Sequence, residues 1–458
     1  MAALVAGRLT GSVSRLLGHG GSSVPGAVAR RVDPALLRKL GGGLESGSLL
    51  ITGTNGKTTS SLLVEQILTA AGLRVLRNRS GANLIVGLTA TLMQAARLDL
   101  SIKADWAVLE TDEASIPRAV EEVRPRLLAV TNFFRDQLDR YGELTSAVKL
   151  VARGAAALSP AAMLVLNADD PHAASLGREA RGPVVYFGLG SPDLALDAGA
   201  ETLDARFCPI CGEELSYSLR FYAHLGHYIC PGCGFARPRP TVEAVDVVRE
   251  GPSVRRVRLL VDGAPTEVTL SLPGTYNIYN AVLAAAVAHG LGVGTEAVVE
   301  GLRTSRGAFG RMETVSFRGR ELRLALVKNP TGFNQVLRAV AEDPRPKMVM
   351  IAINDRYADG RDVSWLWDVD LESMASVMGA VQWVAAGTRA ADMAVRLKYA
   401  GIHPTLIRTV GTHAEDALQA LMEQSTPPLC YVLPTYTAMM ELRGALERQG
   451  LVSSFVEG

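Results

Sequence analysis

The stretch that most constrains this chain is an apolar run followed by a glycine-rich turn and a helical pattern. Residues 49–59 have the sequence Leu-Leu-Ile-Thr-Gly-Thr-Asn-Gly-Lys-Thr-Thr. The apolar run 49–51 predicts a buried strand, and the pattern after the turn predicts a helix from Thr58 to Ala71. Glycines in such a turn let backbone N–H groups approach a polyphosphate, and the helix N-terminus adds partial positive charge. The sequence therefore predicts a phosphate-binding loop between a strand and a helix.

Each polar side chain of this loop has a distinct expected role. Lys57 would neutralise charge on the outer phosphates, and the Thr58 hydroxyl would bind Mg²⁺. A turn that binds nothing is the alternative interpretation, and the strand–loop–helix context speaks against it. The residues expected to hold the nucleotide here are Gly53, Thr54, Asn55, Gly56, Lys57, Thr58 and Thr59.

Length and composition narrow the class of protein. A chain of 458 residues predicts two or three domains, each large enough for its own core. With 47 basic and 46 acidic residues, the charge balance gives no support to nucleic-acid or membrane-surface binding. No apolar run approaches the roughly 18–20 residues of a membrane helix, and the N-terminus lacks a signal-peptide pattern. We therefore expect a cytoplasmic protein without a transmembrane segment.

Polar residues follow three further strand-like runs of the first half. The runs and the residues at their ends are Trp106–Leu109 before Glu110, Leu127–Val130 before Thr131 and Asn132, and Met163–Leu166 before Asn167, Asp169 and Asp170. Strands whose carboxyl ends carry polar residues are typical of a parallel α/β sheet with its active site at that edge. The fold class is therefore α/β.

The chain is expected to hold three parts and one insertion. Residues 1–48 form an N-terminal helical segment packing on a central domain of residues 49–314, and residues 315–458 form a second, Rossmann-like α/β domain. Residues 202–240 break the strand–helix rhythm and predict a small inserted module. The strands expected in the last domain are Leu322–Val327, Met348–Ile353, Trp383–Ala386, Thr405–Arg408 and Tyr431–Leu433.

Glu110 is the candidate magnesium carboxylate. It ends a predicted strand, and Mg²⁺ in nucleotide sites takes one or two carboxylates together with phosphate oxygens. A solvated acidic turn is the alternative. Asp112 and Glu113, which follow, are expected to face solvent or to cap a helix that begins near Ile116.

Four cysteines in the insertion predict a metal centre. Cys208 and Cys211 form one C-x-x-C pair, Cys230 and Cys233 form another, and eighteen residues separate the pairs. This spacing fits a tetrahedral Cys₄ zinc ribbon, which is closed and structural. Two disulfides are the competing interpretation, disfavoured in a cytosolic chain. The histidines between the pairs, His224 and His227, are expected at the surface, and the remaining Cys430 is expected to be a buried, inert thiol.

The loop Asn354–Trp365 follows a predicted strand and is dense in charge. It contains three acids, Asp355, Asp359 and Asp362, together with two arginines. That is more charge than a connecting loop needs, although a solvated loop remains the alternative for any single residue.

Taken together, these motifs resemble the Mur ligase family, and within it the MurT branch. The cysteine insertion and the Asp-Gly-Arg-Asp-Val-Ser-Trp loop carry the resemblance to that branch. It implies a central P-loop domain with a Cys₄ zinc-ribbon insertion and a C-terminal Rossmann-like α/β domain. The stretches that carry the family resemblance are Gly53–Thr59, Thr131–Gly142, Asn167–Pro171, the four cysteines, Tyr276–Asn280, Gly310–Glu313, Asn329–Gly332, Asn354–Asp370 and Pro434–Thr437.

The resemblance implies roles for further residues. Asn277, with Asn167 and Asp170 nearby, would line the nucleotide, and Arg311 would reach the phosphates when the domains close. Lys57 and Arg311 would stabilise charge during the reaction, with Mg²⁺ on Thr58 and Glu110. A second Mg²⁺ site of the wider family is in doubt, because Gln137 replaces a histidine and Lys149 fits the position of a metal-binding lysine poorly.

The resemblance also implies an activity and a partner. The activity is ATP-dependent amidation of the α-carboxylate of D-isoglutamate in the lipid II stem peptide, through an acyl phosphate. Ammonia would come from a GatD-type glutaminase subunit, whose catalytic triad an aspartate of this chain would complete. Asp362 is the best match, with Asp359 and Asp355 as the other candidates. Action at the inner face of the cell membrane follows.

Two other functions stay open. Only 48 residues precede the first strand, too few for a UDP-binding domain, which disfavours a substrate held through UDP. A ligase of the Mur or folylpolyglutamate type that adds an amino acid is nevertheless one alternative. The other is a non-enzymatic P-loop and zinc-ribbon scaffold.

Overall fold

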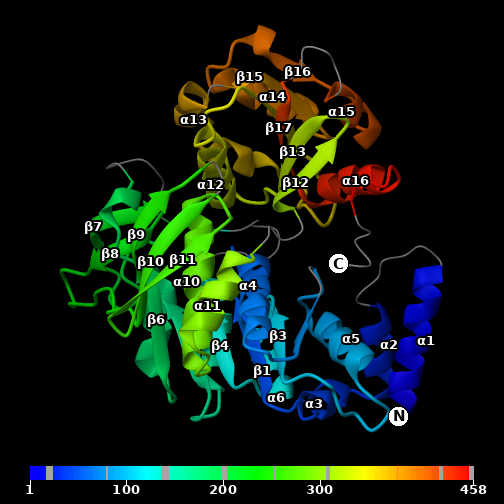
Figure 1. The fold of residues 1–458 in the computed structure, drawn as a ribbon, viewed down its shortest axis with the longest axis vertical. Helices are drawn as coiled ribbons and strands as arrows, with labels where there is room; N and C mark the ends of the chain where they lie inside the picture. The colour runs from blue at the N-terminus through cyan, green and yellow to red at the C-terminus, as the bar shows by residue number, and fades with distance from the viewer. Residues whose placement is uncertain are drawn as a thin grey trace. The chain divides into compact units, whose positions relative to one another are not determined.

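The computed structural model describes residues 1–16, 24–78, 81–135, 144–196, 204–251, 254–305, 310–378, 380–421 and 427–452. These residues divide into two compact units, one formed mainly by described residues between 1 and 305 and the other mainly by residues 310–452 (Figure 1). The chain is an α/β protein with an inserted cysteine module, as the sequence predicts.

Among the described residues, the first unit is built on a nine-stranded sheet in the order β11-β10-β9-β6-β5-β4-β1-β3-β2. Neighbouring strands are parallel from β2 through β9, and β10 and β11 add an antiparallel edge. The strands are β1 (Gly47–Thr52), β2 (Val75–Arg77), β3 (Trp106–Glu110), β4 (Leu127–Val130), β5 (Met163–Asn167), β6 (Val184–Leu189), β9 (Val242–Arg249), β10 (Arg255–Val261) and β11 (Ala264–Leu270).

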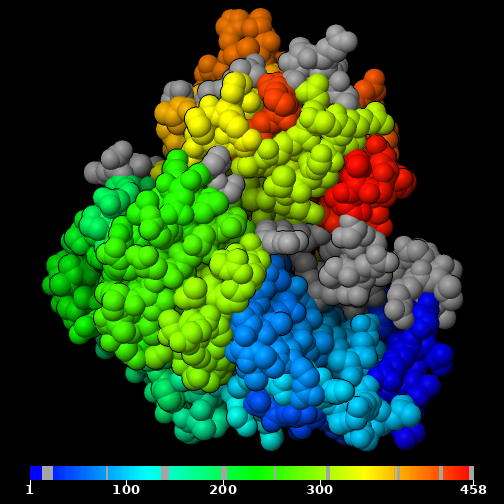
Figure 2. Space-filling model, viewed as in Figure 1, coloured from blue at the N-terminus to red at the C-terminus, as the bar shows by residue number. Residues whose placement is uncertain are grey.

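Helices cover this sheet. α10 and α11 pack against α4, and Figures 1 and 2 show α4 and α11 side by side on one face. The helices are α1 (Ala2–Leu16), α2 (Val24–Val32), α3 (Leu36–Gly41), α4 (Lys57–Ala70), α5 (Ile85–Ala95), α6 (Ile116–Val123), α8 (Leu144–Ala156), α9 (Pro171–Ser175), α10 (Thr275–Gly290) and α11 (Thr295–Arg303), with the short 3-10 helices η1 (Glu113–Ser115), η2 (Leu176–Glu179) and η3 (Pro192–Leu194).

The N-terminal helices are part of the first unit's core. Leu4, Leu36 and Leu37 belong to the same buried cluster as Leu50 of β1. Arg30 of α2 forms a buried ion pair with Glu122 of α6 at 2.6 Å, which ties the helices α2 and α6 together. Within the described ranges, every helix is too short or too polar to cross a membrane.

The inserted module has its own small sheet. β7 (Ser216–Tyr222) and β8 (Leu225–Ile229) form an antiparallel hairpin between the two cysteine pairs. Apolar and cysteine side chains close a small core there, namely Ala174, Cys208, Leu215, Tyr228, Cys230 and Phe235. A module this small has little apolar surface to bury, so a bound metal would contribute to its folding.

In the described part of the second unit, six strands form a sheet in the order β12-β13-β17-β14-β15-β16. All neighbours are parallel except β12 and β13. The elements are β12 (Arg311–Phe317), β13 (Arg320–Ala325), α12 (Pro330–Ala341), β14 (Lys347–Ala352), η4 (Ser364–Asp368), α13 (Leu371–Val377), β15 (Ala380–Ala386), α14 (Ala390–Tyr399), η5 (Pro404–Leu406), β16 (Ile407–Thr409), α15 (Ala414–Ala420), β17 (Leu429–Pro434) and α16 (Tyr436–Glu447).

Four of the five strands expected in the second unit are present. The fifth, Thr405–Arg408, is instead the 3-10 helix η5 followed by the short strand β16, and β12 lies outside the expected set. The division between the units lies before β12, so the boundary expected between residues 314 and 315 falls inside a strand. Met312, Val315 and Phe317 face the core, while the positions between them carry polar or charged side chains. An antiparallel edge strand beside a parallel sheet explains why this stretch looks half polar.

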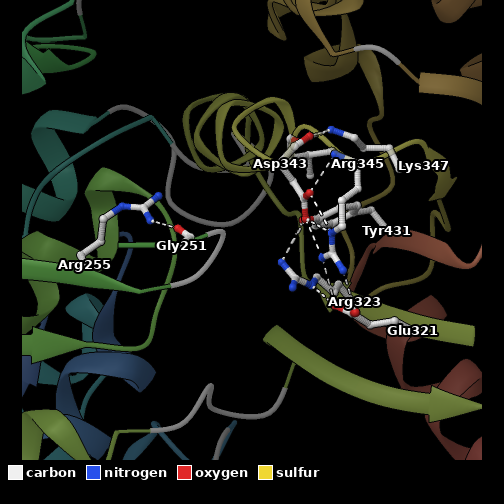
Figure 3. Close-up of polar contacts among 9 residues, drawn as sticks. Gly251, Arg255, Glu321, Arg323, Asp343, Arg345, Lys347 and Tyr431 are labelled. Atoms are coloured by element: carbon white, nitrogen blue, oxygen red, sulfur yellow. Dashed lines mark hydrogen bonds and ion pairs between the residues drawn. The ribbon is translucent and has the colours of Figure 1, made fainter. Parts of the chain in front are cut away.

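A charged cluster lies at the amino ends of the parallel strands of the second unit. Asp343 accepts bonds from Arg345 at 2.7 Å and from the Tyr431 hydroxyl at 3.0 Å (Figure 3). Glu321 pairs with Arg323 at 2.6 Å and with Arg345 at 3.0 Å. Burial works against ionisation of Asp343, but the bond from Arg345 prevails and holds its pKa at about 2. These groups satisfy one another at the end of the sheet opposite to where α/β sites form, which indicates a structural cluster.

Candidate functional site

The phosphate-binding loop has the predicted form. β1 ends at Thr52, and α4 begins at Lys57 with Gly56 as its N-cap residue. Gly53 has φ +120°, and a Cβ there would lie 2.2 Å from the Thr131 hydroxyl oxygen. Gly56 has φ +88°, and a Cβ there would lie 2.3 Å from Oδ1 of Asn280. Both positions therefore require glycine, and the N-terminus of α4 that follows them is suited to bind an anion.

Lys57 is buried and already has a charged partner. Its Nζ lies 3.2 Å from Oε2 of Glu113 and donates to the Gly53 carbonyl oxygen. The expectation that Glu113 faces solvent or caps a helix is wrong, because the side chain turns inward and is buried against Lys57. Asp112 is buried too and caps η1 by accepting a bond from the Ala114 N–H at 3.1 Å. Before any ligand binds, Lys57 is therefore held in a buried ion pair with Glu113.

The structure brings the two predicted magnesium ligands together. The Thr58 hydroxyl donates to Oε2 of Glu110 at 2.9 Å, and both side chains are buried. Asn78 fixes the Glu110 backbone, accepting from its N–H and donating to its carbonyl oxygen at 2.8 Å each. A hydroxyl and a carboxylate oxygen, completed by phosphate oxygens and water, are a ligand set that suits Mg²⁺.

Asn132, which follows β4, holds the phosphate-binding loop through two hydrogen bonds. Its Oδ1 accepts from the Asn55 N–H at 2.9 Å, and its backbone carbonyl accepts from the Thr54 N–H at 2.9 Å. The Thr54 hydroxyl in turn accepts from the Phe134 N–H at 3.0 Å. Residues 132–134 thus set the conformation of residues 54 and 55, a role that the sequence indicated only as a polar stretch after a strand.

Asn167 and Asp170 are fully buried behind this loop. The Asn167 amide donates to the Thr131 carbonyl at 2.9 Å. Asp170 caps α9 and accepts from the Phe133 N–H at 2.6 Å. Burial opposes ionisation of Asp170, but the His224 ring and backbone N–H donors hold its pKa below the usual value. These contacts give both residues a supporting position, and direct contact with the nucleotide stays a prediction.

Asn277 reaches the loop through a neighbour on α10. Its Oδ1 accepts from the Asn280 amide at 3.1 Å, and Asn280 accepts from the Ser60 hydroxyl of α4 at 3.2 Å. Because Asn280 also lies against Gly56, the first turn of α10 sits beside the phosphate loop. The predicted placement of Asn277 near the nucleotide is compatible with this geometry and stays a prediction.

The four cysteines form one cluster. Their Sγ atoms all lie within 4.8 Å of one another, with Cys208 and Cys233 3.7 Å apart and Cys211 and Cys230 3.4 Å apart. Thiolates bound tetrahedrally to zinc at about 2.3 Å would lie about 3.8 Å from one another, so the donor set and its spacing fit zinc. None of these sulfur atoms is within disulfide bonding distance of another.

Of the two histidines of the module, His224 is completely buried and not at the surface as expected. His227 is half-buried, and its Nε2 lies 2.8 Å from the Leu189 carbonyl oxygen. The hairpin that carries them packs against the rest of the first unit. The spacing of the four cysteines could not predict this packing.

Three acids of the second unit differ in accessibility. Asp359 is buried and accepts from the Thr437 N–H at 2.7 Å. Asp355 accepts from the Thr388 hydroxyl at 2.8 Å and lies 3.8 Å from Arg389. Asp362 is exposed and accepts from the Ser364 N–H, which lowers its pKa.

The remaining predicted residues are placed as follows. Arg311 begins β12 in the second unit, and its role at the phosphates stays a prediction. Lys149 lies exposed on α8. Gln137 is outside the described residues. Cys430 is buried in β17, where burial raises its pKa to about 11, as expected for an inert thiol.

Known proteins of similar sequence and structure cover nearly the whole chain. The Mur ligase middle domain matches residues 51–220, and the MurT ligase C-terminal domain matches residues 326–439. The lipid II isoglutaminyl synthase (glutamine-hydrolyzing) subunit MurT of Streptococcus pneumoniae is 35% identical, over 98% of this chain and 97% of its own. Its Staphylococcus aureus counterpart is 34% identical, over 96% of each chain. The solved pseudomurein peptide ligase type C of Methanothermus fervidus superposes with a TM-score of 0.66 at 24% identity, over 89% of this chain and 79% of its own.

Proposed function

Because the chain belongs to the Mur ligase family, in its MurT branch, we propose that it is the synthase subunit of a lipid II isoglutaminyl synthase. The α-carboxylate of D-isoglutamate in the stem peptide would take the γ-phosphoryl group of ATP, giving an acyl phosphate and ADP. Ammonia would then displace phosphate and leave the amide. The observation that carries this proposal is the pairing of Thr58 with Glu110 next to Lys57.

The chain's own residues would act mainly by positioning and by charge. The N-terminus of α4 and Lys57 would hold the phosphates, and Thr58 and Glu110 would hold Mg²⁺. Bound Mg²⁺ would neutralise charge on the transferred phosphoryl group. Asn132 would keep the loop in the conformation that presents these groups. Arg311 is proposed to add positive charge from the second unit.

Ammonia at neutral pH is mostly protonated, so a partner that delivers it unprotonated is expected. We propose a GatD-type glutaminase, with an aspartate of this chain orienting the partner's catalytic histidine. The accessibility of the three acids favours Asp362, because Asp359 is buried and Asp355 is held by Thr388. Such a complex would work in the cytoplasm at the inner face of the membrane, where lipid II is made available.

Product mass tests the proposal. Lipid II, ATP and Mg²⁺ are incubated with the chain and a co-expressed glutaminase plus glutamine, or with the chain alone plus ammonium. We expect one carboxyl group to become an amide in both reactions. ATP turnover that appears only with an added amino acid would instead support the ligase of the Mur or folylpolyglutamate type. Absence of any substrate-stimulated ATP hydrolysis, with the partner present, would support the scaffold.

The role of Asp362 is tested in the same assay. Asp362→Asn should abolish amidation from glutamine and leave amidation from ammonium intact, because only the partner's triad loses a carboxylate. Asp368→Asn, an exposed acid six residues further on, is the matched control and should retain both activities. Equal loss of both activities in Asp362→Asn would refute the interface role.

A further inference from the structure

The closed end of the cysteine module is unusual because a hairpin turn is buried there. The cysteines lie at the open end of the β7–β8 hairpin, whereas its turn is formed by Ala223 and His224, next to Tyr222 at the end of β7. None of these three residues is more than 2% exposed, and Ala223 has φ +48°. Turns normally lie at the surface, where water satisfies their backbone. The turn is therefore inserted into the first unit.

Two rings of the hairpin, those of Tyr222 and His224, pack against the same phenylalanine, Phe134. The Tyr222 ring stacks on Phe134 with centroids 4.9 Å apart, and the His224 ring lies 4.7 Å from the same phenylalanine. Nε2 of His224 is 3.6 Å from Oδ2 of Asp170. Neither ring nitrogen has a hydrogen-bond partner among the described residues, so packing and the contact with Asp170 hold the ring.

Asp170 and Phe134 connect the turn to the phosphate loop. The carboxylate oxygen of Asp170 that faces His224 also accepts the Phe133 N–H at 2.6 Å. The next N–H, that of Phe134, donates to the Thr54 hydroxyl at 3.0 Å. Three contacts, His224 to Asp170, Asp170 to Phe133 and Phe134 to Thr54, therefore connect His224 to the loop that is proposed to bind ATP.

A second connection runs through the neighbouring aspartate. Asp169 accepts from Gly226 of the hairpin through its carbonyl oxygen at 2.9 Å, and from Arg237 through its carboxylate at 2.6 Å. Arg237 follows the second cysteine pair in the sequence. The other carboxylate oxygen accepts from the Tyr279 hydroxyl of α10 at 2.8 Å. The hairpin, through Gly226, and the segment after the second cysteine pair, through Arg237, are thus both bonded to Asp169. Asp169 in turn contacts α10, whose first turn lies beside the phosphate loop.

We propose that the cysteine module positions the nucleotide loop and that His224 is the positioning residue, acting through Asp170 and Phe134. The proposal rests on the proposed function in one respect, that residues 53–59 bind ATP. A metal at the cysteines would order the hairpin, and the ordered turn would hold residues 132–134 against Thr54 and Asn55. Metal loading and nucleotide binding would then strengthen each other by the same factor, as linkage requires.

Direct binding of Mg²⁺-ADP, measured by calorimetry, tests His224. His224→Ala should weaken binding by roughly 5- to 150-fold, the range of typical coupling between sites. His224→Phe keeps a ring against Phe134 and should weaken binding less. Both variants should stay folded, with about one zinc per chain by elemental analysis. In steady state, the KM for ATP should rise while kcat changes little, a separation that general loss of stability does not produce.

His227→Ala is the matched control, since it removes a histidine of the same hairpin that contacts the end of β6 instead. It should bind Mg²⁺-ADP like the wild type. The proposal is overturned if His224→Ala binds Mg²⁺-ADP within twofold of wild type. It is equally overturned if His227→Ala weakens binding as much, because a general effect of the hairpin would then explain both results.

Removal of zinc supplies an independent readout. A zinc-selective chelator, with Mg²⁺ kept in excess, should weaken Mg²⁺-ADP binding to the wild-type chain but add little in His224→Ala, where the connection is already cut. Equal weakening in both chains refutes the path through His224. A wild-type chain that binds Mg²⁺-ADP but makes no amide refutes the proposed function without touching this inference. A chain that makes amide with an unchanged KM for ATP in His224→Ala refutes the inference alone.

Discussion

The ion pair between Lys57 and Glu113 offers the sharpest test of how the resting site is held. The two charged groups are 3.2 Å apart, and each side chain is less than 10% exposed. Removing one partner leaves the other charge buried and alone, which typically costs about 3–5 kcal/mol of folding free energy. Removing both Lys57 and Glu113 leaves no unpaired charge from this ion pair in the buried site. The double variant should therefore be destabilised by less than the sum of the two single variants.

The expected size of the coupling follows from the separation. Coulomb's law at 3.2 Å with an effective dielectric constant of about 20 gives an attraction of about 5 kcal/mol. Desolvation of both groups offsets much of this attraction, and contacting residues rarely couple by more than about 3 kcal/mol. We therefore expect a coupling free energy of about 2–3 kcal/mol in the cycle Lys57→Met, Glu113→Gln and the double variant.

The chain allows this cycle to be measured in the first unit alone. Of its four tryptophans, Trp106 lies in β3, and the other three, Trp365, Trp367 and Trp383, lie in the second unit. Replacing those three with phenylalanine leaves Trp106 as the only tryptophan reporter. Urea unfolding followed by its fluorescence then gives a free energy for the unit that contains the pair, which whole-chain unfolding of two units would not.

An exposed pair in the same unit is the control. Lys39 and Asp33 are closer together, at 2.6 Å, but much more accessible than the buried pair. Exposed pairs contribute about 0.2–1 kcal/mol, so the cycle Lys39→Met and Asp33→Asn should show a coupling below about 1 kcal/mol. Additive effects at Lys57 and Glu113, or equal coupling in the two cycles, would contradict the argument from burial.

Two further predictions concern the cysteine module and the charged cluster of the second unit. Cys208→Ser should lose about one zinc per chain and lower the melting temperature, because structural zinc contributes folding free energy; unchanged zinc by elemental analysis would contradict it. The depressed pKa of Asp343, about 2 against an ordinary 3.8, contributes stability that is present above about pH 4 and is lost as the pH falls toward 2. Acid titration of tryptophan fluorescence from the second unit should show this loss, and Asp343→Asn should remove that part of the pH dependence.

Much of the fold could be predicted because its signals are local. The buried run of β1, the glycines and the start of α4 are neighbours in sequence, so their arrangement follows from backbone chemistry. Glu110 could be placed opposite Thr58 because the carboxyl ends of adjacent parallel strands meet at one edge. The four cysteines needed only their spacing to predict a common centre.

The partners of buried charged residues could not be predicted in the same way. Glu113 looked like a helix cap because it follows a strand and precedes a helical run, yet its partner lies 56 residues away. His224 looked like a surface residue because four thiolates already fill a structural metal site and leave no ligand position for a histidine. In both cases burial depends on a charge or a ring contributed by a distant part of the chain. Sequence patterns record which face of an element is apolar, not which polar groups meet.

The charges of the resting site also determine how its ligand must arrive. One buried base, Lys57, lies near two buried acids, Glu110 and Glu113, so the site has an excess of negative charge before any ligand binds. A polyphosphate alone would add further negative charge in a region of low dielectric, whereas Mg²⁺ can take the carboxylate of Glu110 and leave Lys57 to the phosphates. We therefore expect ADP to bind weakly without Mg²⁺, and Glu110→Gln to reduce that dependence. Calorimetric titration of both chains with ADP, with Mg²⁺ and with a chelator instead, measures the difference. An equal Mg²⁺ requirement in the variant would place the cation elsewhere than on Glu110.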